Sequence, residues 1–361
     1  MKDTSTVFFI DVPEKSTLEQ RVTAMKTLLE GAGYPVMFAA PEKVGVKIHV
    51  GEKNNTTYVP PKVVREAVMP LLHKGCLPFL TETSTLYKGE RSNAVLHLRH
   101  AQDHGFTLEK TGAPFVMADG LAGNSEIEVA IPGELHSSVF IAREAVYADG
   151  LVVISHATGH MENVLGAALK NLGMGLASRK GKLRQHSTHK PSIDPDVCTQ
   201  CRQCLRWCPE DAVVEAEGRI MILEEKCIGC GECLTVCNFD AVEFDWGSGS
   251  RDIQQQVAEH ALGSLTGKEG KIFFVNCLFD MTKDCDCVGR KQEPVLPDVG
   301  IIASADPVAV DQATLDLTLE RSPKSLAEAS YPDLDPTIQL EHGERIGLGS
   351  RKYELRVIPR K

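Results

Sequence analysis

The sequence predicts an α/β protein whose mainly parallel β-sheet has helices on both faces and is interrupted by a small inserted α+β module. Short apolar strands alternate with amphipathic helices in both halves of the chain. Between them, residues 198–237 contain eight of the twelve cysteines, and the Gly/Ser-rich residues 246–250 indicate a linker. We therefore expect an α/β domain built from residues 1–190 and 248–361, with the module at 191–247. Three separate domains are the alternative, since a carboxyl-terminal segment of about 110 residues is long enough to fold alone.

The amino-terminal segment alternates strands and helices. A helix at 16–30 has apolar residues at helical spacing and ends at Gly31, and a helix at 61–74 has proline in its first turn and ends at Gly75. Residues 151–154 are a continuous apolar run, which is typical of a buried parallel strand. In chain order, we expect strands at 7–10, 44–50, 77–80 and 151–154, helices at 16–30, 61–74, 92–104, 138–149 and 164–172, and a loop at 173–193.

The α/β pattern resumes after the linker. We expect a helix at 253–265, strands at 271–275 and 299–303, and a helix from Asp306 to residue 319, in which Asp306 is the N-cap and Pro307 takes the first helical position. No G-x-G-x-x-G sequence follows the first strand and no P-loop is present, so the sequence does not support a dinucleotide or nucleotide-phosphate site.

The cysteine-rich stretch contains two runs with the same spacing. The first is Cys198-x-x-Cys201-x-x-Cys204-x-x-x-Cys208, and the second is Cys227-x-x-Cys230-x-x-Cys233-x-x-x-Cys237. This is the spacing of a bacterial two-cluster ferredoxin, in which the fourth cysteine of each run binds the other cluster. We therefore assign one [4Fe–4S] cluster to Cys198, Cys201, Cys204 and Cys237, and the second to Cys227, Cys230, Cys233 and Cys208.

Structural zinc is the alternative for these cysteines. Zinc sites usually have two pairs of ligands separated by a longer spacer, whereas each run here has four cysteines and the runs are duplicated. The second run has Asn238 where proline would usually stand, which changes the local turn and removes no ligand. The spacing therefore favours two [4Fe–4S] clusters.

The net charge and the apolar content limit the classes of function. The formal net charge is −10, which argues against non-specific nucleic-acid binding because such binding needs a basic face. No stretch approaches the roughly 18 apolar residues of a membrane-spanning helix, and residues 1–10 form a short strand rather than a secretion signal. We therefore expect a cytoplasmic protein that binds neither nucleic acid nor membrane and keeps its remaining cysteines reduced.

Polar side chains follow several of the expected strands. Lys47 lies within the expected 44–50 strand, Glu82 follows the 77–80 strand, and the late strands end at Asn276 and at residues 304–306. Ligands of open parallel sheets bind beyond the carboxyl ends of the strands, so we expect these groups to converge at one site. Lys47, Glu82 and Lys170 are candidates for binding substrate or transferring protons. For Lys170, which ends the expected 164–172 helix, a helix-capping role is the alternative.

Two further pairs are candidates for chemistry. His156 and His160 follow the 151–154 strand, and imidazoles four residues apart can share a metal or relay protons. Ordinary hydrogen bonding in a loop is the alternative. Cys285 and Cys287 flank a single residue and can clamp a soft metal or close a redox disulfide. Two inert reduced thiols are the alternative.

A cationic segment precedes the module. It contains Lys182, Arg184, His186 and His189, which could neutralise an anion near the clusters. A solvated loop is the simpler interpretation and is preferred here.

Several stretches outside the cysteine-rich module resemble the iron–sulphur branch of the family called "domain of unknown function 362". The resemblance covers most of the chain and implies one α/β unit interrupted by a two-cluster ferredoxin module, without implying a substrate. The matching stretches are residues 46–52, 81–87, 118–120, 155–160, 170–175, 284–287 and 304–311.

These observations lead to three hypotheses of function. The first is an iron–sulphur oxidoreductase that passes electrons from two [4Fe–4S] clusters to a small substrate or a second metal ion in the α/β cleft, with His156, His160, Cys285 and Cys287 as the candidate second site. The second is a non-catalytic electron carrier that docks on a partner enzyme. The third is an accessory protein that handles metal or clusters. A redox partner protein is expected in the first two. The size of the α/β part favours the first, because a two-cluster module needs only about 60 residues.

Overall fold

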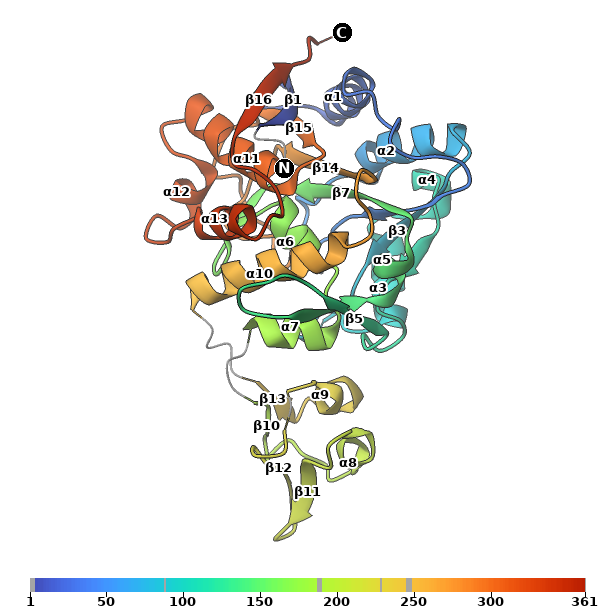
Figure 1. Cartoon of the computed structure of the whole chain (residues 1–361), viewed down its shortest axis with the longest axis vertical. Helices are drawn as coiled ribbons and strands as arrows, with labels where there is room; N and C mark the ends of the chain where they lie inside the picture. The colour runs from blue at the N-terminus through green and yellow to red at the C-terminus, as the bar shows by residue number, and fades with distance from the viewer. Residues whose placement is uncertain (1–3, 88, 187–189, 228, 245–248, 361) are drawn as a thin grey trace.

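Strands from both halves of the chain form one eight-stranded sheet (Figure 1). The computed structural model describes residues 4–87, 89–186, 190–227, 229–244 and 249–360. In spatial order the strands are β16 (Tyr353–Val357), β1 (Ser5–Asp11), β15 (Gly300–Ser304), β14 (Ile272–Leu278), β7 (Gly150–His156), β2 (Lys43–Lys47), β3 (Leu77–Glu82) and β4 (Phe115–Met117).

The sheet is mainly parallel, as the sequence predicts. Five of its seven strand pairings are parallel, and both antiparallel pairings involve β15. The reversed direction of β15 corrects one expectation. Ser304 at its carboxyl end pairs with Phe274 near the start of β14, so residues 304–306 lie at the opposite edge from Cys277 and do not join the other strand ends.

Helices cover both faces of the sheet. In β7, Leu151 and Val153 belong to one apolar core, whereas Val152 and Ile154 belong to the other, because successive side chains point to opposite faces. Every residue of β7 is therefore buried. The first core includes α6 (Ala168–Gly173), α10 (Ser250–Leu265), α11 (Pro307–Arg321), α12 (Leu326–Ser330) and α13 (Ile338–Arg345), and the second includes α1 (Leu18–Gly31), α2 (Pro61–His73) and α3 (Ala94–Asp103).

Three expected segments differ from the structure. Residues 138–149, expected as a helix, form β6 (Ser138–Ala142), which pairs with β5 (Glu126–Ala130), and then the short α5 (Arg143–Tyr147). Residues 164–172, expected as a helix, begin with β9 (Val164–Gly166), which pairs with β8 (Thr158–His160). The expected loop at 173–193 contains the helix α7 (Arg179–His186). The remaining short helix is α4 (Leu108–Thr111).

The cysteine-rich residues form a ferredoxin-like module with its own small core, below the sheet in Figure 1. Its two halves repeat one design, in which Arg202 and Gly231 occupy equivalent left-handed positions before a five-residue helix. Most of the expected linker at 246–250 lies outside the described residues. The module consists of β10 (Ser192–Ile193), α8 (Gln203–Trp207), β11 (Val213–Ala216), β12 (Arg219–Ile222), α9 (Glu232–Val236) and β13 (Val242–Glu243).

Candidate functional site

The module gathers its eight cysteines into two sets, and each set surrounds a hollow of about 20 Å³. In each set the fourth cysteine comes from the other run, because the chain crosses between the two halves after each short helix. The backbone N–H groups of Ala212 and Gly229 point at the sulphurs of Cys208 and Cys227, at 3.2 and 3.5 Å. Thiolates that receive such hydrogen bonds fit iron–sulphur ligation. One set is Cys208, Cys227, Cys230 and Cys233, and the other is Cys198, Cys201, Cys204 and Cys237.

The set that contains Cys230 is the one nearer the α/β domain, and we call it the proximal set. A Cβ placed on Gly231, the residue after Cys230, would lie 3.1 Å from the Leu183 side chain on α7. The amide of Asn124 also donates to the Glu232 carboxylate at 3.2 Å. The helix α7 therefore lies between the proximal set and the rest of the α/β domain (Figure 1).

On the other side of α7 the α/β domain contains a cavity of about 390 Å³. Its wall is formed where β2, β3 and β7 end, by α6 and α7, and by the loop after β14. The size suits a small molecule. The sequence-predicted candidates Lys47, Glu82, His156, His160, Lys170, Cys285 and Cys287 all line this cavity.

Lys47 and Glu82 form a buried charged pair at the ends of β2 and β3. The Lys47 ammonium donates to the Asn171 side-chain oxygen at 2.7 Å and lies 3.6 Å from Glu82. Burial lowers the pKa of Lys47 to about 8. Burial alone would raise the pKa of Glu82, but Lys47 and the neighbouring histidines lower it well below its usual value. Glu82 therefore stays ionised and also accepts from His97 at 2.9 Å.

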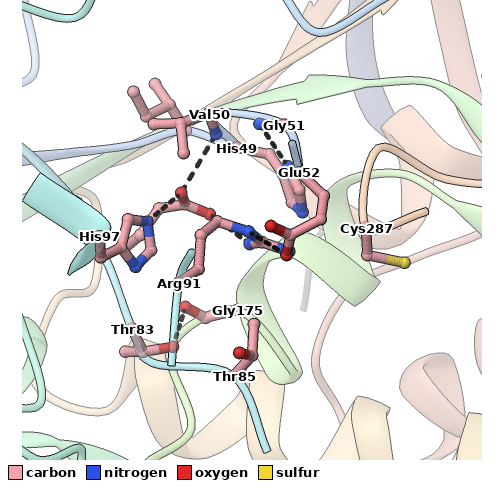
Figure 2. Close-up of polar contacts among 12 residues, drawn as sticks. His49, Val50, Gly51, Glu52, Thr83, Thr85, Arg91, His97, Gly175 and Cys287 are labelled. Carbon is pink, nitrogen blue, oxygen red and sulfur yellow. Dashed lines mark hydrogen bonds and ion pairs between the residues drawn. The ribbon is translucent and has the colours of Figure 1, made fainter. Parts of the chain in front are cut away.

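Arg91 supplies a second cation to the same wall, and it has only 3% of its surface exposed. Its guanidinium donates to Glu52 at 3.2 Å (Figure 2) and to the Tyr87 hydroxyl at 2.6 Å, and it lies 3.7 Å from Glu82. Tyr87 in turn donates to the carbonyl oxygen of Cys287 at 3.3 Å. Arg91 thus connects the β3 end to the loop that carries the two cysteines.

His156 holds that loop from the other side. Its Nδ1 lies 3.0 Å from the Asp286 carboxylate, and its Nε2 lies 2.9 Å from the Phe279 carbonyl oxygen. Burial opposes a charge on His156, but Asp286 and the carbonyl raise its pKa above the usual value. Both ring nitrogens face acceptors, so the ring is an imidazolium with two donated hydrogen bonds. Neither nitrogen is free to bind a metal ion.

His160 has a different protonation state. Its Nδ1 accepts from the backbone N–H groups of Glu162 and Asn163, at 3.1 and 3.0 Å. Burial, with Lys170 and His186, lowers its pKa well below the usual value, so the ring is neutral. A neutral ring that accepts at Nδ1 carries its proton on Nε2. His160 is therefore a hydrogen-bond donor.

Cys285 and Cys287 form a disulfide on the cavity wall, which corrects the expectation that the cysteines outside the two runs are all reduced. The Lys170 ammonium lies 3.3 Å from the Cys285 sulphur and 4.0 Å from the Cys287 sulphur. Burial lowers the pKa of Lys170 to about 8. Ligand atoms of His160, Cys285 and Cys287 lie within 4.8 Å of one another, which is also a spacing that a metal ion could use when the thiols are reduced.

A family model described as "Domain of unknown function (DUF362)" matches residues 44–316. The chain belongs to the DUF362 family. The match spans the cavity residues on both sides of the ferredoxin-like module. No helix among the described residues is both long and apolar enough to cross a membrane.

Curated relatives of this DUF362 chain are similar to it over short segments. It is 35% identical to pyruvate synthase subunit PorD of Methanothermobacter marburgensis over 22% of the chain and 93% of PorD. It is 32% identical to an iron–sulfur protein of Rhodospirillum rubrum over 25% of the chain and 44% of that protein. The chain spans less than half the length of several other curated relatives, among them electron transport proteins. The matched relatives thus include iron–sulfur and electron transport proteins.

A solved structure, the lactate racemase apoprotein from Thermoanaerobacterium thermosaccharolyticum, is similar to the DUF362 chain at 12% identity. The superposition covers 77% of this chain and 52% of that one, with a TM-score of 0.39.

Sequence reasoning missed three cavity groups of this DUF362 protein. Lys182 was expected in a solvated loop, but it is buried, and its ammonium donates to the carbonyl oxygens of Ser84 and Ala177, at 2.8 and 2.9 Å. Arg91 carries no sequence signal, because it lies in an irregular segment. The sequence gives no signal for Asp286 as a site residue other than its position between two cysteines. His189 of the same cationic segment lies outside the described residues.

Proposed function

We propose that this DUF362 protein is an iron–sulphur oxidoreductase in which two [4Fe–4S] clusters pass electrons to a small molecule, or to a second metal centre, in the α/β cavity. The position of α7 is the observation that carries the proposal. Leu183 on this helix contacts the proximal set at Gly231, and Lys182 on the same helix lines the cavity. A single helix, about 10 Å across with its side chains, separates the two sites.

The eight cysteines would hold the clusters, and the bound clusters would supply one-electron transfers. The cavity residues bind and orient the substrate. Lys170 has no oxygen acceptor among the described residues, and His160 presents an N–H group. Lys47 is held by Asn171 and by the carbonyl oxygen of Ile48. An anionic oxygen, such as a carboxylate, is the group that these donors fit best.

Electrons would enter from a redox partner protein at the module. Residues 191–247 contain twelve acidic and four basic residues, so their net charge of −8 makes up most of the net charge of −10 of the chain. Trp207 and Phe239 expose 56% and 44% of their surfaces on the module. A partner with a basic surface around an apolar centre suits this composition, and its association should weaken with salt. The relative PorD is itself a subunit of pyruvate synthase.

A metal-handling accessory protein is the second candidate. It is favoured by the approach of His160, Cys285 and Cys287 within 4.8 Å. In this alternative the clusters serve a partner enzyme, and the cavity transfers a metal ion rather than reducing a substrate. Turnover of a small molecule separates the two candidates.

The first test is metal counting on anaerobically purified wild type beside a C285S/C287S variant. Two cubane clusters predict about 8 iron per chain in both proteins and no other metal. An additional metal that is present only in wild type would show that Cys285 and Cys287 hold a second metal centre in the cavity, which either candidate could use. Iron well below that of two cubanes in fully folded protein would contradict the two-cluster assignment.

The second test is turnover. Protein reduced with titanium(III) citrate is mixed anaerobically with small acceptors that carry a carboxylate, namely 2-oxo acids and 2-enoates, and cluster reoxidation is followed by visible absorbance. An oxidoreductase should be reoxidised by one class, and K170M should lose that reaction. K53M is the control, because Lys53 is exposed at the surface. Cluster reoxidation at the same rate in K170M and in wild type would favour an electron carrier without a substrate site.

A further inference from the structure

The Cys285–Cys287 disulfide lies on the wall of the cavity. We infer that it is a dithiol/disulfide centre that takes two electrons from the module and acts as the immediate reductant in the cavity. The inference deepens the proposed function and rests on it, because the electrons come through the clusters. The second centre of the cavity is then sulphur chemistry of the chain itself rather than a metal ion.

The location of the two sulphurs supports this role. Both cysteines line the cavity, Cys285 is 5% exposed, and Cys287 is more accessible. The Lys170 ammonium lies 3.3 Å from the Cys285 sulphur. A cation at this distance stabilises the thiolate that forms when the disulfide opens. Reduction therefore produces a nucleophilic sulphur that already faces the space where a small molecule would bind.

The loop is held independently of the S–S bond. Asp286, between the two cysteines, is bound by His156 at 3.0 Å and by the Thr57 hydroxyl at 3.1 Å. The backbone of Cys287 is bound by Tyr87 at 3.3 Å. These contacts leave both sulphurs in place when the bond opens, so that it can close again.

The chemistry of His160 favours the disulfide over a metal ion. A metal at this place would need a free lone pair on His160. Its Nδ1 lone pair is engaged by the N–H groups of Glu162 and Asn163, and in this tautomer Nε2 carries the proton. His160 thus offers a hydrogen-bond donor to a thiolate or to a substrate.

The electrons and protons balance within the proposed system. The two [4Fe–4S] clusters held by the eight cysteines of the module would each supply one electron on oxidation, and two electrons would break the S–S bond and leave two thiolates. Two protons convert these thiolates to thiols. The Lys170 ammonium can donate one to Cys285 and regain it from solvent, and the cavity solvent supplies the other. A low-potential one-electron donor, here titanium(III) citrate, re-reduces the clusters.

The experiment measures the redox state of the two cysteines directly. Anaerobic holoprotein is treated with titanium(III) citrate, free thiols are alkylated, and the peptide containing Cys285 and Cys287 is weighed by mass spectrometry. We expect a closed disulfide before reduction and two alkylated thiols afterwards. In C230S, which lacks a ligand of the proximal set, we expect thiol formation by titanium(III) citrate to be lost. C277S is the control, because Cys277 is a buried free thiol on β14 and should leave the reaction unchanged.

A second measurement does not need the clusters. Dithiothreitol should open the disulfide in wild type and in C230S alike, and oxidised glutathione should close it again, which shows that C230S is folded and its centre intact. K170M should slow alkylation of reduced Cys285, because the thiolate loses its cation.

The outcomes distinguish the two proposals. Clusters that are absent or cannot be reduced would contradict the proposed function, while the dithiothreitol and glutathione titration would still test the redox centre. Three results would overturn the inference: thiols that oxidised glutathione cannot close, a metal ion bound to the reduced pair in purified protein, or equal opening by titanium(III) citrate in wild type and C230S.

Discussion

Lys182 and Leu183 are consecutive residues of α7, yet Lys182 lines the cavity and Leu183 contacts the module. The Lys182 ammonium lines the cavity, where burial lowers its pKa to about 7. The Leu183 side chain reaches the backbone of Gly231, next to the cysteine ligands of the proximal set. One turn of helix therefore touches both the electron-transfer module and the cavity, and α7 is the physical connection that the proposed function requires.

Replacing Leu183 with aspartate should weaken the contact between the module and the α/β domain. A carboxylate at this buried position must be desolvated against the module, which costs more than the apolar contact it replaces. We expect L183D to keep its iron and to lose protection from hydrogen exchange in α9, and we expect titanium(III) citrate to open the Cys285–Cys287 disulfide more slowly.

L319D is the matched control for this change. Leu319 is 52% exposed on α11, so the same substitution should leave exchange and disulfide opening at wild-type values. Wild-type exchange of α9 in L183D would show that the module does not depend on this contact.

Pairs of substitutions can test whether the fourth cysteine of each run binds the cluster of the other run. Cys198 and Cys237 belong to one set, whereas Cys198 and Cys208 belong to different sets. The C198S/C237S variant should therefore keep the proximal cluster and about 4 iron per chain, while C198S/C208S should damage both clusters. Iron analysis and electron paramagnetic resonance of the reduced proteins measure this. Equal iron in the two variants would contradict the crossed assignment.

Periodicity was sufficient to predict the sheet and most helices around it. The apolar run of β7 and the capped start of α11 at Asp306 and Pro307 are local signals, and the structure contains both elements. The sequence could not predict the direction of β15, because an apolar strand has the same pattern in either direction. That direction moved residues 304–306 away from the cavity.

The helix α7 was missed for a related reason. Its sequence is mostly cationic and lacks an apolar stripe, so it was expected to be a solvated loop. Its stability comes from tertiary contacts on two sides, which no local pattern records. The cavity candidates were found because they follow strands, whereas Arg91 lies in an irregular segment and reaches the site only through the fold.

The His156–Asp286 pair should make stability depend on pH in a defined direction. The pKa of His156 in the folded protein is raised above its unfolded value, so its contribution is fully present below about pH 6.5 and is lost as pH rises through the folded pKa. H156Q leaves the buried carboxylate without its cation, and we expect a loss of about 3–5 kcal/mol near pH 6. The difference in melting temperature between wild type and H156Q should shrink between pH 6 and 9.

H73Q provides the control, because His73 is exposed on α2. Its melting temperature should follow wild type across the whole range. A difference between wild type and H156Q that stays constant or grows with pH would show that His156 is not an imidazolium in the folded protein.

Asp311 on α11 fixes the start of α6, the helix that carries Lys170 to the disulfide. Its buried carboxylate accepts from the backbone N–H groups of Ala168 and Leu169, both at 2.8 Å, and from the Asn276 amide at 2.7 Å. An asparagine has one acceptor oxygen, so D311N leaves at least one buried N–H unpaired and should cost about 1–3 kcal/mol.

The exposed Asp316 on the same helix gives the control D316N, with an expected change in the free energy of unfolding under about 0.5 kcal/mol. Loss of this cap should let the first turn of α6 move and carry Lys170 away from Cys285. D311N should therefore also slow alkylation of reduced Cys285, measured beside K170M. A destabilised D311N whose Cys285 still reacts at the wild-type rate would show that the placement of Lys170 does not depend on this cap.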